Sequence, residues 1–129
     1  MSRPLERILY AEDEPDIQEV ATLALETVGG FELAVCGTGQ EVLDKVAAFK
    51  PDLLLLDVMM PVMDGPTALL EIQKLAGMSA IPAIFMTAKV QPQEIAKYLE
   101  IGALDVIPKP FDPMTLADTI RQIWEKAGK

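Results

Sequence analysis

The stretch "DLLLLDVMMPVMDG", residues 52–65, contains four consecutive leucines that end at a carboxylate, Asp57. An apolar run without polar alternation is typical of a parallel strand that is buried on both faces of a sheet. At the end of the stretch, Asp64-Gly65-Pro66 provides a cap and a first turn for a helix. The stretch therefore predicts a central strand at 53–56 that carries an acidic side chain to its carboxyl end.

Apolar runs and amphipathic stretches alternate along the rest of the chain. Four further strands are expected at 7–11, 31–36, 83–86 and 105–108. Helical spacing of apolar residues is found at 16–28, from about 42 to 49, at 64–75, at 93–101, and from about 112 to 127. Alternating strands and helices predict an α/β fold with a parallel sheet. Because Pro108 cannot donate to a strand ladder, we expect the fifth strand at an edge.

Length and composition favour one compact domain that spans residues 1–129, without an output domain. The chain carries 11 basic and 20 acidic residues, a formal charge of −9, which argues against general nucleic-acid binding. No apolar run approaches membrane-spanning length, and the first residues lack the apolar centre of a signal peptide. A cytoplasmic protein without membrane or nucleic-acid partners is expected.

Histidine is absent from the sequence. The chain therefore lacks a histidine base, nucleophile or metal ligand, and it cannot form a Ser-His-Asp triad. The single Cys36 rules out an internal disulfide. Any chemistry in this protein must use carboxylates, hydroxyls, lysines or a bound metal.

Polar residues follow the expected strands where each strand ends. These residues are Glu12, Asp13, Asp57, Thr87 and Lys109. Ligands of open parallel sheets bind at the carboxyl ends of the strands, so the five side chains should converge. Crowded carboxylates need a counter-charge, and Mg²⁺ binds through carboxylates and phosphate oxygens. An aspartate beside a metal and a lysine can act as a nucleophile toward phosphorus.

Four motifs together resemble the response-regulator receiver domain of two-component signalling. They are "ILYAEDEPD", "LLLLDVMMPVMDG", "AIFMTA" and "PKPF", in this order, and the likeness covers nearly the whole chain. It is closest to the stand-alone, chemotaxis-regulator-like type. The resemblance implies a flavodoxin-like, doubly wound fold with strand order 2-1-3-4-5 and helices on both faces. It also implies a signalling module rather than an enzyme, except for phosphotransfer to its own aspartate and the hydrolysis that follows.

The resemblance assigns a role to each residue at the strand ends. Asp57 would accept a phosphoryl group from a phosphohistidine on a partner, and Thr87 and Lys109 would contact the phosphoryl oxygens. The Mg²⁺ ligands would be Glu12, Asp13, Asp57 and the carbonyl of Met59. The bond between Lys109 and Pro110 would be cis, as it often is in the family.

Two features depart from the family pattern. Many members carry a switching Tyr or Phe on the fifth strand, where this chain has Val106. Met59 and Lys89 lie two residues after Asp57 and Thr87, at positions that tune the phosphate lifetime in the family. Because an apolar Met59 offers no hydrogen bond to an attacking water, we predict slow self-dephosphorylation.

The expected partners are a sensor histidine kinase or a histidine phosphotransfer protein, together with an unknown downstream protein. The family implies an output surface on the fourth helix, fifth strand and fifth helix, with Lys97, Tyr98, Glu100 and Asp105 as expected exposed residues. Transfer of the phosphoryl group onward in a phosphorelay and pairing of two copies remain open. Two other functions also remain open: a docking module that ignores phosphate, and a Mg²⁺-dependent aspartyl phosphatase. The phosphatase is disfavoured because such enzymes place a second Asp where this chain has Met59.

Overall fold

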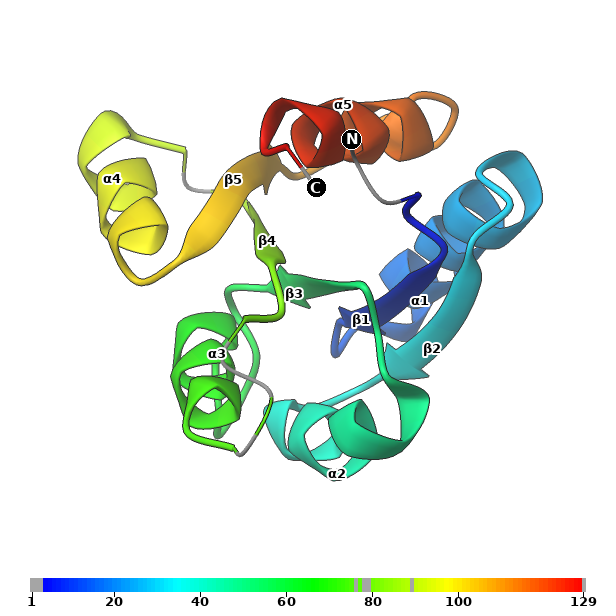
Figure 1. The fold of residues 1–129 in the computed structure, drawn as a ribbon. Coiled ribbons are helices and arrows are strands. Elements are labelled where there is room, and N and C mark those ends of the chain that lie inside the picture. Colours follow the sequence, from blue (N-terminus) through cyan, green and yellow to red (C-terminus); the bar gives the residue numbers. More distant parts are fainter. Residues whose placement is uncertain (1–3, 76, 78–79, 89, 129) are drawn as a thin grey trace.

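The computed structural model describes residues 4–75, 77, 80–88 and 90–128, and it contains a five-stranded sheet with helices on both faces (Figure 1). The strands are β1 (Arg7–Ala11), β2 (Glu32–Cys36), β3 (Leu53–Asp57), β4 (Ala83–Thr87) and β5 (Ala103–Pro108). Their order is β2-β1-β3-β4-β5, and every neighbouring pair is parallel. The predicted fold class and strand order are confirmed.

The leucine run of β3 forms the centre of the sheet. All four of its leucines are fully buried, and β3 pairs with β1 on one side and with β4 on the other. β5 lies at an edge and pairs with β4 alone, with Pro108 beside Thr87 at its end. The predictions of a central leucine strand and of an edge strand ending in proline are both confirmed.

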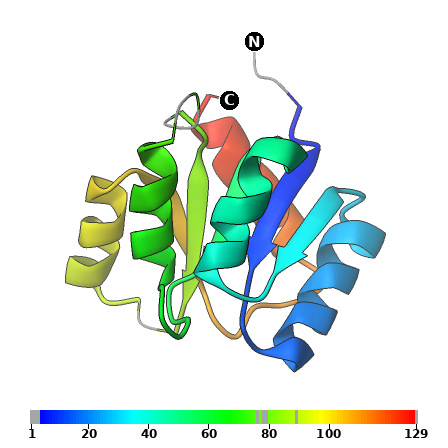
Figure 2. The ribbon, with the colours of Figure 1, turned by 90° about the horizontal axis from the view of Figure 1, so that it is seen from below.

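Helices cover both faces of the sheet. The helical segments are α1 (Pro15–Thr22), η1 (Leu23–Val28), α2 (Gly39–Phe49), α3 (Gly65–Gln73), α4 (Pro92–Glu100) and α5 (Leu116–Lys126). Buried residues of α1, η1 and α5 form one core cluster with the sheet, and those of α2, α3 and α4 form a second cluster. In Figure 2, α2 and α3 stand in front of the sheet while α5 lies behind it.

The first helix differs from its prediction. We expected one α-helix over 16–28, but the structure changes at Leu23 into a π-helix, η1. At its end the amide of Gly29 donates to the carbonyl of Ala24, five residues back. Apolar spacing predicts helix but does not distinguish this wider turn from an α-turn. Other predicted limits were also wrong: α2 begins at Gly39, α5 at Leu116 and β5 at Ala103.

The parallel order brings all five carboxyl ends of the strands to one edge of the sheet, which is the lower edge in Figure 2. The predicted polar residues lie at this edge: Asp57 and Thr87 end β3 and β4, and Glu12, Asp13 and Lys109 follow β1 and β5. Among the described helices, none combines the length and the apolar character that crossing a membrane requires.

Candidate functional site

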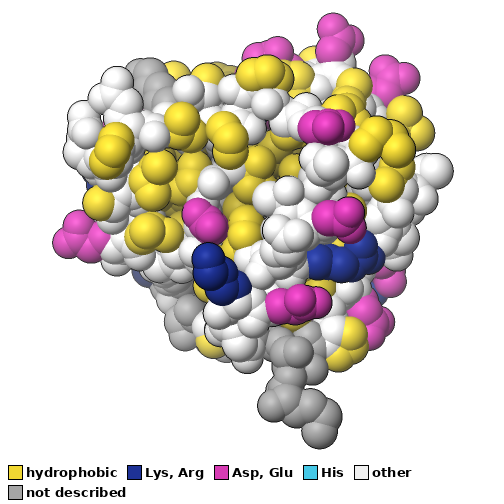
Figure 3. Space-filling view, turned by 90° about the horizontal axis from the view of Figure 1, so that it is seen from above, with side chains coloured by type: hydrophobic (Ala, Val, Ile, Leu, Met, Phe, Trp, Pro, Cys, Tyr) yellow, Lys and Arg dark blue, Asp and Glu magenta, His cyan; other side chains and the backbone are white. Residues whose placement is uncertain are grey.

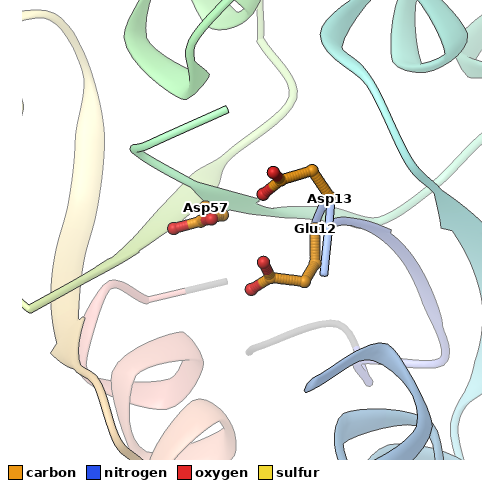
Figure 4. A group of neighbouring side chains, drawn as sticks. All are labelled: Glu12, Asp13 and Asp57. Atoms are coloured by element: carbon orange, nitrogen blue, oxygen red, sulfur yellow. The ribbon is translucent and has the colours of Figure 1, made fainter. Parts of the chain in front are cut away.

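Three carboxylates meet at the carboxyl edge of the sheet (Figure 4). Glu12 and Asp13 follow β1, and Asp57 is the last residue of β3. One oxygen from each carboxylate lies within 4.8 Å of the other two. Glu12 and Asp57 are buried, whereas Asp13 is more exposed. The predicted convergence of the three acids is therefore present in the structure.

Lys109 supplies a positive charge to this cluster from the end of β5. Its Nζ lies 2.9 Å from Oε1 of Glu12 and 3.3 Å from Oδ1 of Asp57. The lysine side chain is only 15% exposed, so solvent screens these ion pairs weakly. Three carboxylates and one ammonium leave the cluster with a formal charge of −2.

Thr87 completes the group of predicted residues. It is buried at the end of β4, and its carbonyl accepts a hydrogen bond of 2.9 Å from the amide of Lys109. This backbone contact holds the ends of β4 and β5 together, so Thr87 and Lys109 reach the same edge. The peptide bond between Lys109 and Pro110 is cis, as the resemblance implied.

The backbone around Asp57 depends on a glycine. A Cβ atom placed on Gly65 would lie 2.5 Å from the carbonyl oxygen of Asp57, which real Cβ atoms essentially never do. The amide of Gly65 donates to the carbonyl of Val58, and Asp64 caps α3 by accepting from the amide of Thr67 at 2.8 Å. The loop after β3 thus folds back closely over the strand that carries Asp57.

Burial and charge shift the pKa values of Glu12, Asp57 and Lys109. Burial raises the pKa of Asp57 and of Glu12, and the ammonium of Lys109 only partly opposes this effect. Burial lowers the pKa of Lys109, but its hydrogen bond to Glu12 and the charge of Asp57 outweigh burial and raise it. Two buried carboxylates that resist ionisation thus share one cation.

The residues present fit a divalent cation. Their donor set consists of carboxylate oxygens, which Mg²⁺ prefers, and the cluster has a charge of the opposite sign and equal size. A bound cation would also favour the ionised forms of Glu12 and Asp57 against the cost of their burial. The acidic cluster is thus a candidate site for Mg²⁺.

Met59 and Lys89 were predicted to tune the lifetime of the phosphoryl group, and Met59 also to bind Mg²⁺ through its carbonyl. The side chain of Met59 is 63% exposed, and its amide donates to Oδ1 of Asp57 at 3.4 Å, while the role of its carbonyl stays a prediction. Lys89 lies outside the described residues. Val106, the departure from the family pattern, is half-buried on β5 against the second core cluster.

The prediction for Tyr98 was wrong. We expected an exposed side chain, but its ring is buried and meets Phe85 edge-on, with 5.3 Å between the ring centroids. An aromatic side chain on an amphipathic helix gains more from the apolar core than from water. Asp105 is half-buried, and only Lys97 and Glu100 of the four expected residues are exposed.

The sequence did not predict two contacts at the site. The side-chain amide of Gln18 on α1 donates to the carbonyl of Glu12, and the amide of Glu14 donates to Oε2 of Glu12 at 3.3 Å. Gln18 occupies an ordinary polar position of a helix, so no residue pattern marks it. Gly65 carried a signal, since Asp-Gly before a helix indicates a tight turn, but its closeness to Asp57 requires coordinates.

Comparison with known proteins agrees with this arrangement. The family model of the response regulator receiver domain matches residues 8–121. The DNA-binding response regulator MtrA of Mycolicibacterium smegmatis is 37% identical over 116 residues, which are 90% of this chain and 49% of that protein. The transcriptional regulatory protein CseB of Streptomyces coelicolor is 34% identical over 121 residues, 94% of this chain and 50% of that protein. The chain spans about half the length of these curated relatives.

The chain is also similar to solved structures of response regulators. The chemotaxis protein CheY4 of Vibrio cholerae superposes with a TM-score of 0.85 at 25% identity, covering 93% of this chain and 99% of that one. The N-terminal domain of a response regulator receiver protein from Methanoculleus marisnigri has a TM-score of 0.74 at 34% identity, covering 96% of this chain and 94% of that one. The chain belongs to the response regulator receiver domains of two-component signalling systems.

Proposed function

We propose that Asp57 accepts a phosphoryl group from a phosphohistidine on a sensor histidine kinase or a histidine phosphotransfer protein. The observation that carries this proposal is the position of the Lys109 ammonium between the buried carboxylates of Glu12 and Asp57. A structural ion pair needs one acid for one lysine. Here two buried acids share a single cation at the edge of the sheet, which suits a site that receives further charged groups.

In the proposed reaction, a carboxylate oxygen of Asp57 attacks the phosphorus of the phosphohistidine. The new O–P bond forms as the N–P bond breaks, and the imidazole nitrogen leaves with the bonding electron pair and takes up a proton. The product on this chain is an acyl phosphate, and no oxidant or reductant is involved. Since these 129 residues contain no histidine, they cannot supply the phosphohistidine themselves.

The residues that would hold Mg²⁺ are Glu12, Asp13, Asp57 and, through its carbonyl, Met59. When bound, the ion neutralises charge on the transferring phosphoryl oxygens. The carboxylates of Glu12 and Asp13 orient the site without accepting the phosphoryl group themselves. Asp57 is preferred as the acceptor because it ends the central strand, where full burial of the leucines fixes its position.

Thr87 and Lys109 would contact the phosphoryl oxygens. The ammonium of Lys109 binds an anionic oxygen as a point charge, and the hydroxyl of Thr87 donates a hydrogen bond to a second one. The link between the amide of Lys109 and the carbonyl of Thr87 supports this shared role, because it couples the backbones of the two residues.

The phosphorylated domain would signal through protein contacts, or pass the group on in a phosphorelay. The proposed output surface consists of α4, β5 and α5. In Figure 3 the molecule is seen from the side of α5, with α4 and β5 on the left, and apolar side chains gather on that left side. Exposed Lys97 and Glu100 lie on α4. A downstream protein or a second copy of the chain would bind there, and its affinity would change with the population of the phosphorylated conformation.

Intact-mass spectrometry tests the proposal. The protein is incubated with acetyl phosphate in the presence of Mg²⁺ or of EDTA, beside an Asp57→Asn variant. We expect one added phosphoryl group that requires Mg²⁺ and is absent from the variant. The same mass on the variant would refute Asp57 as the acceptor.

The other outcomes point to the alternatives. If no adduct forms with acetyl phosphate or with a phosphorylated histidine protein, the chain is a docking module that ignores phosphate. If phosphate is released steadily from many phosphoesters, the chain is an aspartyl phosphatase. We disfavour the phosphatase because the exposed side chain at position 59 is a thioether and not a carboxylate.

A further inference from the structure

The hydroxyl of Tyr10 is an unpaired polar group inside the protein. Tyr10 is fully buried on β1, and its hydroxyl oxygen is the one buried side-chain polar atom in the described part of the chain that lacks a hydrogen-bond partner. A buried hydroxyl without a partner destabilises the folded state, because the hydrogen bonds that it makes to water in the unfolded chain are lost. The neighbouring core residues that share its cluster are apolar, and leucine or phenylalanine in its place would avoid this cost. The hydroxyl therefore calls for an explanation.

Tyr10 and Glu12 project from the same face of the sheet. They are two residues apart on an extended segment, because the amide of Glu12 still donates to the carbonyl of Cys36 as in the strand ladder. Asp57 shares this face, since Tyr10 pairs with Leu55 and Asp57 comes two residues later on β3. The phenol thus lies beneath the acidic cluster, on the side of α1 and α5.

The charges of the cluster act on this phenol. Burial raises the pKa of Tyr10 far above its ordinary value, and the carboxylates of Glu12 and Asp57 raise it further. The phenol therefore keeps its proton and remains a hydrogen-bond donor. The acceptors whose charges act on it are these two carboxylates, and Glu12 receives the ammonium of Lys109 at 2.9 Å.

We infer that Tyr10 is a positioning residue of this site: its hydroxyl donates to the carboxylate of Glu12, directly or through one buried water, when Lys109 leaves Glu12 for a phosphoryl group on Asp57. The inference rests on the proposed function. It explains why a costly unpaired hydroxyl is kept in the unmodified protein, because the acceptor is held by Lys109 in that state. No covalent bond to Tyr10 forms or breaks.

Without Lys109, Glu12 would lose its ammonium partner and would depend on a bound cation for its counter-charge. Glu12 is fully buried, and besides Lys109 its carboxylate accepts a hydrogen bond from the amide of Glu14 at a long 3.3 Å. A donor that arrives as the ammonium departs would keep the carboxylate oriented toward the cation site. Stabilisation of the state with Lys109 displaced lowers the barrier to phosphorylation.

The Tyr10→Phe variant separates this role from a purely structural one. Removing an unpaired hydroxyl should leave the melting temperature of the unmodified protein equal or higher, and its Mg²⁺ affinity unchanged. Phosphorylation by acetyl phosphate should become about tenfold slower, the effect of one hydrogen bond to a charged group. Tyr98→Phe is the matched control, since it removes the only other tyrosine hydroxyl from the opposite core cluster, and it should phosphorylate at the wild-type rate.

A spectroscopic measurement reports on Tyr10 itself. In the Tyr98→Phe background, Tyr10 is the sole tyrosine, and its ultraviolet resonance Raman doublet should shift toward the donor form upon phosphorylation. If the wild type is phosphorylated while Tyr10→Phe matches its rate and the doublet stays constant, the role of Tyr10 is overturned and the proposed function stands. If the wild type takes up no phosphoryl group from any donor, the proposed function fails and the role of Tyr10 fails with it.

Discussion

Lys109 and Glu12, 97 residues apart in the chain, form an ion pair of 2.9 Å between a fully buried carboxylate and a largely buried ammonium. The same ammonium lies 3.3 Å from Asp57. The side chain of Lys109, which follows β5, thus contacts residues at the ends of both β1 and β3. This arrangement neutralises two acids only in part, and the imbalance determines the effects expected of substitutions at Lys109 and Asp57.

Removal of the shared cation should destabilise the metal-free protein. Lys109→Gln leaves Glu12 and Asp57 buried without their ammonium, and we expect a loss of about 3 kcal/mol in the free energy of unfolding at neutral pH in EDTA. Mg²⁺ should restore part of this loss. Urea unfolding with and without Mg²⁺ measures both effects.

The control for this variant is Lys45→Gln. Lys45 forms an exposed pair with Glu41 one helical turn away, so its loss should change the stability by less than about 0.5 kcal/mol. Equal stability of Lys109→Gln and Lys45→Gln in EDTA would show that the buried acids do not depend on Lys109.

Neutralising Asp57 should have the opposite effect. Burial raises the pKa of Asp57 in the folded state, so the folded protein holds this proton to a higher pH than the unfolded chain. The ionised carboxylate therefore opposes folding above the raised pKa, and this cost vanishes as the pH falls below the ordinary aspartate pKa. Asp57→Asn should gain about 1 kcal/mol, or roughly 4 °C, at neutral pH without metal.

The pH dependence is the decisive feature of the Asp57→Asn comparison. Thermal unfolding in EDTA between neutral and acidic pH should show the advantage of the variant shrinking as the pH falls. An advantage that grows toward acidic pH would mean that Asp57 is stabilised in its charged form, contrary to our reading of its burial.

The approach of Gly65 to Asp57 predicts intolerance to any side chain. Gly65→Ala places a Cβ 2.5 Å from the carbonyl oxygen of Asp57, and we expect a loss of about 2 kcal/mol or more from the required backbone shift. In Gly37→Ala the nearest atom, Oε1 of Glu41, is 3.4 Å away, so this control should lose less than about 1 kcal/mol. Similar denaturation midpoints for the two variants would contradict the close contact.

Met59 should make the phosphorylated protein long-lived. Its exposed thioether borders the site but cannot orient an attacking water, so self-dephosphorylation should be slow. Met59→Asn introduces an amide that can hold such a water, and we expect hydrolysis several-fold to about tenfold faster. Timed intact-mass spectra after removal of the donor give both rates. Loss of the wild-type phosphoryl group within seconds would refute the prediction.

Much of the fold followed from local patterns. The four leucines of β3 predicted a central strand because only a strand covered on both faces tolerates such a run, and Pro108 predicted an edge because it lacks an amide donor. The meeting of Glu12, Asp13 and Asp57 followed from parallel strand direction and residue type. These features depend on rules that act over a few residues.

The remaining features depend on contacts that a sequence pattern does not contain. The periodicity of 16–28 fits both the α-turns and the π-turns that the chain uses there. Tyr98 was assigned to the surface because the family implies an output surface on the fourth helix, but in the structure its ring packs against Phe85. The unpaired hydroxyl of Tyr10 is visible only when every neighbouring atom is known.

The central claim is that Asp57, and no other carboxylate of the cluster, carries the phosphoryl group. Borohydride reduces an acyl phosphate to the corresponding alcohol, so peptide mass spectrometry after phosphorylation and reduction identifies the residue that was modified. The account predicts homoserine at position 57 in samples with Mg²⁺, and unmodified aspartate there in samples with EDTA. Reduction at Glu12 or Asp13 instead, or at no residue of a protein that has gained a phosphoryl mass, would contradict it.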